Sequence, residues 1–158
     1  MKILVRLKAY GLHFDIWALC LFFLIMIPNC IWFAVPAPCD VLRGDSVTGT
    51  LDTIASVCQV VMIAALCLLQ NRECKKRHKN TWFTPCILLV IICSLFYMIS
   101  WIVYYAGIVN VDVILGLTVF PCLAFLFFGL NRENWIACVP IIIFTVCHIL
   151  YGIVNFIL

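Results

Sequence analysis

Five stretches of this sequence are apolar almost without interruption, and each is long enough to cross a bilayer. A helix rises about 1.5 Å per residue, so roughly 20 apolar residues span the hydrocarbon core. Transmembrane strands would alternate in polarity, which these stretches do not. We therefore predict an all-α membrane protein, a single domain over residues 1–158 built as a bundle of five transmembrane helices. The expected spans are residues 14–35, 51–70, 84–105, 111–130 and 135–158.

The composition and the charge pattern agree with this class. Hydrophobic residues make up 66% of the chain and charged residues 11%, which is more apolar surface than a soluble domain buries. Nine of the ten lysines and arginines lie in the N-terminal tail, in residues 71–80 and at Arg132, and the alternate loops hold only Arg43. Because cytoplasmic loops are enriched in these residues, we predict a cytoplasmic N-terminus and an outer C-terminus. The basic loop then contacts anionic lipid rather than nucleic acid.

Two of the expected spans resemble each other at a shift of sixty positions. Residues 51–73 and 111–133 coincide at seven of twenty-three positions, and both segments end in Asn-Arg-Glu. One interpretation is a parallel two-helix repeat followed by a fifth helix. The other is convergence, because an acid in the first turn and an arginine after the last turn both complement the helix dipole.

Polar residues within the spans gather at one depth. Counting from the span ends places them in the half of the bundle that we expect to face outward, and the inner halves are nearly free of them. Such groups need partners in hydrocarbon, so they face a polar cavity or hold helices together. Both interpretations stay open, and His148 is the strongest functional candidate because imidazole also exchanges a proton near neutral pH. The candidate ligand-binding residues are Asn29, Gln59, Tyr97, Ser100, Thr118, His148 and Asn155.

Pro28 interrupts the first span directly before Asn29. A proline has no backbone N–H, and its ring clashes with the carbonyl four residues earlier, here that of Leu24. We therefore predict a structural kink at Pro28 that opens the bundle toward the outer side. A kink of this kind is tolerated where protein or water satisfies the freed carbonyl.

Known catalytic and metal-binding motifs are missing from the sequence. It contains no GxSxG, HExxH, Walker or GxGxxG motif, and its eleven cysteines include no CxxC pair and no Cys/His cluster at ligand spacing. We expect no metal and no cofactor. An enzyme acting on a lipid-like substrate is the least favoured class.

Three stretches carry a resemblance to known sequences. FDIWALCLFFLIMIPNCIWF, VPAPCDVLR and PIIIFTVCHILYGIVNFIL resemble parts of uncharacterised small multi-span integral membrane proteins of Gram-positive anaerobic bacteria. The resemblance implies a multi-pass protein of a bacterial plasma membrane and brings no function or site residue with it.

Two functions from different classes follow from these observations. The first is a carrier or sensor that binds a small solute or ion in an outward-facing polar pocket. The alternative is a structural or regulatory membrane subunit whose polar residues are packing contacts or an interface with a homo-oligomer or another membrane protein. The two differ in whether the polar stripes share a cavity or bury directly against one another.

Overall fold

The computed structural model describes residues 10–77 and 84–158 and confirms the five-helix membrane fold. Each long helix is apolar and long enough to cross a bilayer, and its ends lie within two residues of the expected span. Lys2, Arg6, Lys8 and Lys79, which contributed to the predicted orientation, lie outside the described residues. The long helices are α2 (Ile16–Ala34), α3 (Gly49–Leu68), α5 (Pro85–Tyr105), α6 (Val111–Asn131) and α7 (Trp135–Phe156).

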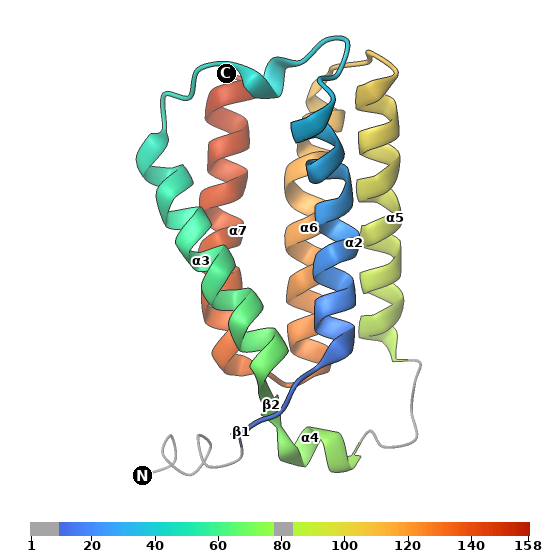
Figure 1. The fold of residues 1–158 in the computed structure, drawn as a ribbon, viewed down its shortest axis with the longest axis vertical. Coiled ribbons are helices and arrows are strands. Elements are labelled where there is room, and N and C mark those ends of the chain that lie inside the picture. Colours follow the sequence, from blue (N-terminus) through green and yellow to red (C-terminus); the bar gives the residue numbers. More distant parts are fainter. Residues whose placement is uncertain (1–9, 78–83) are drawn as a thin grey trace.

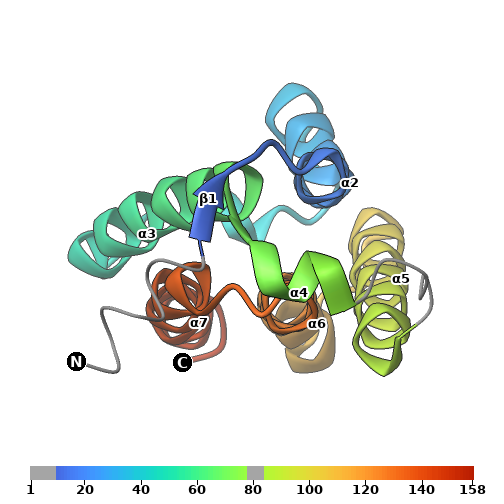
Figure 2. The same cartoon turned by 90° about the horizontal axis from the view of Figure 1, so that it is seen from below.

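Four of the helices form a curved row, with the fifth on its concave side. Seen from below, α3, α7, α6 and α5 follow one another, and α2 lies between the two ends of the row (Figure 2). Within the spanning windows, 61% of the residues of α6 are buried but only 22% of those of α2. The core therefore surrounds α6, and α2 is the most peripheral helix.

The two halves of the proposed repeat are not packed alike. Helix α5 packs along α6, whereas α3 packs mainly against α7 and contacts α2 only sparsely. In Figure 1, α3 crosses in front of α7, whereas α2 lies in front of α6. Duplication of a two-helix unit therefore remains a prediction from the sequence alone.

Polar residues fix where several helices begin. The side chains of Thr84, Asn110 and Asn134 each accept a hydrogen bond from the backbone N–H three residues later, and so cap α5, α6 and α7. Side chains of this type satisfy an N–H group that has no partner within the helix. Helix α2 continues through Pro28, and the kink there remains a prediction.

One end of the bundle holds a two-stranded sheet that the sequence analysis did not predict. Strand β1 (Tyr10–Leu12) pairs antiparallel with β2 (Leu69–Asn71), and a short helix, α4 (Arg72–Arg77), follows. Helix α3 therefore ends two residues before residue 70, the expected end of the second span. The N–H of Leu69 still bonds the carbonyl of Ala65 in the last turn of α3, and from Leu69 on the chain is extended and pairs with β1. We call this the sheet end of the bundle (Figure 1).

Asn134 joins two helices at the sheet end. Its side-chain nitrogen donates to the carbonyls of Ala65 at 3.0 Å and Leu69 at 2.8 Å, and its oxygen accepts from the N–H of Ala137. The residue is only 1% exposed. Because the nitrogen and the oxygen of this buried amide both form hydrogen bonds, the side chain connects the end of α3 to the start of α7 and fixes their register.

An ion pair closes the same end between α2 and α6. The Arg132 Nε lies 2.9 Å from Asp15 Oδ2, and the Asp15 side chain is only 5% exposed. Asp15 also accepts a hydrogen bond from the N–H of Trp17 and so caps α2. The sequence analysis did not identify this pair, because 117 residues separate its members.

Candidate functional site

Ser100 lies at a close contact between α5 and α6. Its hydroxyl donates to the carbonyl of Phe96 within its own helix at 2.9 Å. A Cβ atom added to Gly116 would lie 2.1 Å from the Ser100 Oγ, so the glycine is what allows the two backbones to approach. This small-residue contact is typical of helix packing in membranes.

Thr118 occupies a similar contact between α6 and α7. Its hydroxyl donates to carbonyls of its own helix, at Ile114 and Leu115. Its methyl group would lie 2.5 Å from a Cβ atom at Gly152. Like Ser100, Thr118 is buried and fully engaged, so its position favours a packing role.

Asn29 and Tyr97 contact each other directly. The Asn29 amide donates to the Tyr97 hydroxyl at 2.8 Å and to the carbonyl of Ile25 at 3.1 Å. Tyr97 is 2% exposed. The sequence analysis placed these residues at the same depth, and the structure adds that they join α2 to α5. The polar pair next to Pro28 thus has a partner in the neighbouring helix.

Asn155 attaches the loop between α2 and α3 to α7. Its side-chain oxygen accepts from the N–H of Val47 at 2.8 Å, and its nitrogen donates to Thr48 Oγ1 and to the carbonyl of Tyr151. Asn155 therefore lies nearer than the other candidates to the end of the bundle that carries this loop, and it holds the loop in place.

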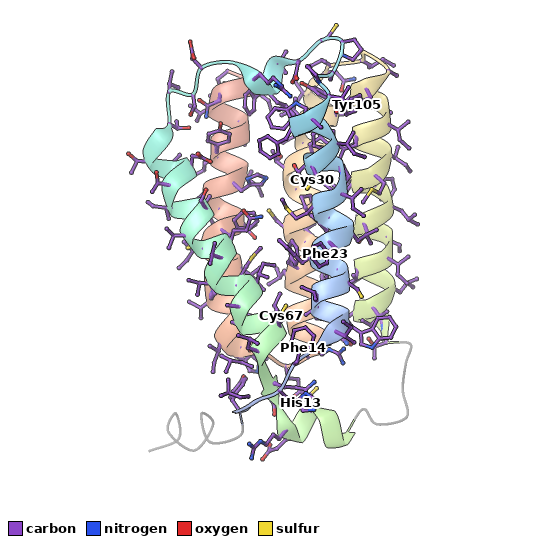
Figure 3. All side chains as sticks on the ribbon, in the orientation of Figure 1. His13, Phe14, Phe23, Cys30, Cys67 and Tyr105 are labelled. Atoms are coloured by element: carbon purple, nitrogen blue, oxygen red, sulfur yellow. The ribbon has the colours of Figure 1, made fainter. Side chains whose placement is uncertain are left out.

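The same loop contains a charged cluster that sequence reasoning missed. Asp40 accepts hydrogen bonds from the Trp32 indole at 2.9 Å and the Tyr104 hydroxyl at 2.8 Å, and pairs with Arg43 at 2.9 Å. The Arg43 guanidinium also lies over the Trp32 ring, 5.0 Å from its centroid. Near it, Tyr105 donates to the carbonyl of Val35 (Figure 3). We call the end of the bundle that holds this cluster the Asp40 end. The sequence did contain a signal for the cluster, because the acid, the tryptophan and the arginine lie within twelve residues.

The Asp40 cluster has a pH dependence whose sign follows from its contacts. Desolvation alone would raise the pKa of Asp40, but hydrogen bonds from Trp32, Tyr104 and Ala37, with the charge of Arg43, outweigh it and lower the pKa. A lowered pKa means that the carboxylate stabilises the fold above its unfolded value of about 4 and that this contribution is lost as the pH falls through the folded value.

Replacing Asp40 with asparagine is expected to lower the free energy of unfolding by about 1–2 kcal/mol at neutral pH, because hydrogen bonds to a charged acceptor are weakened. The difference from the native protein should narrow as the pH falls below about 4. Denaturation in detergent micelles as a function of pH measures both effects. Asp45→Asn, an exposed acid of the same loop, is the control and should change little; an equal loss in both variants would contradict the assignment.

Gln59 and His148 differ from the other candidates in how few hydrogen bonds their polar groups make to the described residues. Within residues 10–77 and 84–158, the one hydrogen-bond contact of the Gln59 amide is with the Met26 sulfur, at 3.8 Å. The His148 ring stacks on Phe144 with centroids 5.0 Å apart, and among the described residues no hydrogen bond to the imidazole is found. Each side chain is half-buried. Both therefore retain hydrogen-bonding groups inside a membrane bundle, where such groups are costly if left unused.

The end contacts of α3 and α7 set the relative level of these residues. Asn134 bonds the carbonyl of Leu69 at one end of the helix pair, and Asn155 bonds Thr48 at the other. The antiparallel register between these contacts places Gln59 level with Phe144, and His148 about one helical turn nearer the Asp40 end. Asp52 lies a further turn along α3 and interacts electrostatically with His148.

Burial changes along the inner faces of α2, α3 and α7. Toward the sheet end, the inward-facing residues are nearly inaccessible, as at Leu21, Met62 and Ile141. Toward the Asp40 end, Trp32, Gln59 and His148 keep some accessible surface, whereas Ala55, Phe144 and Gly152 are buried there as well. The facing residues of α5 and α6 are buried at both levels.

Comparison with known proteins adds no assignment. The chain matches no protein-family model, no curated protein and no solved structure.

Proposed function

We propose that this chain is a membrane protein that binds a small solute, as a carrier or sensor, between α2, α3 and α7. The proposed site consists of Asp52, Gln59, Phe144 and His148, which we call the His148 site. One observation carries the proposal: Gln59 and His148 face inward at adjacent levels, yet keep both accessible surface and unused hydrogen-bonding groups. A solute would supply the partners that the protein does not.

The shape of the burial pattern supports an opening at the Asp40 end. Three inward-facing residues of that half, Trp32, Gln59 and His148, keep some accessible surface, and apolar side chains such as Met62 and Ile141 close the other half. Ala55, a small buried residue on α3, lies level with His148 in the antiparallel register. A solute that enters from the Asp40 end would therefore stop at an apolar floor.

Most of the polar candidate residues bond to other groups of the protein, which supports a different role for them. Asn29, Tyr97, Ser100, Thr118 and Asn155 bind one another, their own helices or the loop. We infer that these hold the helices around the site rather than contact the solute. The same contacts favour the second candidate function, a structural or regulatory membrane subunit, in which Gln59 and His148 would also be packing residues.

The orientation and location follow the sequence pattern. We propose that the Asp40 end faces outward and the sheet end lies in the cytoplasm of a bacterium, with the chain in the plasma membrane. Nine of the ten lysines and arginines lie in the N-terminal tail, in residues 71–80 and at Arg132 of the sequence, and the alternate loops hold only Arg43. The solute would then reach the His148 site from outside the cell.

Cysteine accessibility tests the proposed site. In a background in which the exposed cysteines Cys20, Cys30 and Cys39 are replaced, Gln59→Cys and His148→Cys are expected to react with small charged methanethiosulfonates added to the protein in vesicles. Thiols react as thiolates, which form in water and not in an apolar core. Mass measurement of the labelled protein gives the extent of reaction.

Matched controls on the same helices separate water access from other causes. Met62→Cys and Ile141→Cys face inward in the closed half and should stay unlabelled. Val60→Cys faces outward, with 71% of the valine exposed, and should also stay unlabelled because lipid covers it. If Gln59→Cys and His148→Cys are as inert as these controls toward every reagent, the solute-binding proposal fails and the structural alternative replaces it.

A further inference from the structure

We infer that the solute class of the His148 site is a small organic cation, such as an amine or a quaternary ammonium compound. The inference rests on the proposed function, because it assigns a ligand to the same site. It is drawn from the charges and rings that surround His148 and from which of those charges are already neutralised.

Among the described residues, Asp52 is the one ionised group at the level of the site that has no partner of its own. It lies in the first turn of α3, two turns from Gln59 on the same face of the helix, and interacts electrostatically with His148. Within that part of the chain, its carboxylate makes no ion pair and no side-chain hydrogen bond. Asp40, by contrast, is bound by Arg43, Trp32 and Tyr104.

The positive charge in the half of the bundle toward the Asp40 end is already neutralised. Arg43 is its one lysine or arginine in the described sequence, and it pairs with Asp40 and stacks on Trp32. Asp45 and Asp52 are exposed acids at the same end. A mouth lined by one sign of charge, with apolar walls around it, concentrates ions of the opposite sign. An anion would have no free cation to bind among the described residues of this half.

The remaining groups fit an organic cation rather than a bare metal ion. The His148 ring stacked on Phe144, together with the Met26 sulfur beside Gln59, gives the site an apolar and aromatic wall, which suits the apolar groups of an organic cation. The Gln59 carbonyl oxygen can accept a hydrogen bond from an amine. A hard metal ion would need six or more oxygen ligands, and no cluster of metal ligands is found among the described residues.

Paired thiol reagents of opposite charge test this assignment. His148→Cys, in the background described above, is treated with the trimethylammonium and the sulfonate forms of ethyl methanethiosulfonate, and each rate is divided by the rate with free mercaptoethanol. We expect the normalised ratio to favour the cationic form. Adding Asp52→Asn should lower that ratio about tenfold, because one nearby charge acts in opposite directions on the two reagents.

Asp112→Asn is the matched control, because it removes an acid from the equivalent first turn of α6 and is expected to leave the ratio nearly unchanged. Tetramethylammonium chloride should slow the cationic reagent more than sodium chloride at equal ionic strength. Equal rates for the two reagents, or equal effects of Asp52→Asn and Asp112→Asn, would overturn the cation assignment while leaving solute binding intact. Equal slowing of the cationic reagent by the two salts would contradict the inference that the bound cation is organic. Failure of both reagents to react would instead refute the proposed function.

Discussion

Replacing Arg132 with methionine is expected to lower the free energy of unfolding by about 2–4 kcal/mol, because a buried charge loses its partner. The substitution keeps the apolar stem but removes the guanidinium that neutralises Asp15. The Asp15 carboxylate, only 5% exposed, would then be buried without a counter-ion at the start of α2. Because α2 is the most peripheral helix, we expect its sheet end to detach first.

The repeated Asn-Arg-Glu motif supplies a control for this prediction. Arg72 occupies the same motif position as Arg132 but is exposed, so Arg72→Met is expected to change stability by no more than about 0.5 kcal/mol. Adding Asp15→Asn to Arg132→Met should restore part of the loss, because the uncompensated charge is removed. Denaturation in mixed detergent micelles measures all three variants. Equal losses for the two arginines would show that the ion pair contributes nothing.

Substituting Gly116 with alanine is expected to destabilise the protein by about 1–3 kcal/mol, although alanine favours a helix by about 1 kcal/mol over glycine. The new Cβ atom would lie 2.1 Å from the Ser100 Oγ and 3.0 Å from its Cβ atom. Either the serine gives up its bond to Phe96, or α5 and α6 move apart. Both outcomes weaken the most extensive contact between neighbouring helices in the bundle.

Gly49→Ala is the matched control, because no atom lies within 4 Å of a Cβ atom there. It should be neutral or stabilising in the same denaturation assay. Adding Ser100→Ala to Gly116→Ala should recover part of the lost stability, since the closest clash is with the hydroxyl. If Ser100→Ala gives no recovery, the contact between α5 and α6 has been assigned to the wrong residue.

The sequence predicted the spans closely because hydrophobic length alone decides where a membrane helix can run. It did not predict the sheet at the end of the second span, where Leu69–Asn71 pair with the distant strand β1. That pairing depends on a tertiary contact and leaves no periodic signal in three residues. The predicted orientation remains a prediction, since it concerns a membrane rather than the contacts of the chain.

For the candidate site residues, the sequence predicted the depth in the bundle but not the contacts that each side chain makes. Counting along helices placed Asn29 and Tyr97 at one level, and they bond across α2 and α5. Counting could not show that Ser100 and Thr118 face glycines of neighbouring helices, because contact depends on how each helix is rotated. The Asp15–Arg132 pair was missed because 117 residues separate its members, whereas the Asp40 cluster was a local pattern that could have been found.

The division of the polar residues into holding groups and a solute site is the central claim. Native mass spectrometry of the gently solubilised protein tests it most directly, by comparing the native chain with His148→Phe and Ser100→Ala. We expect a bound small-molecule adduct that is retained in Ser100→Ala and lost in His148→Phe, with all three proteins folded by circular dichroism. Spectra that are the same for all three proteins, with or without an adduct, would contradict the claim.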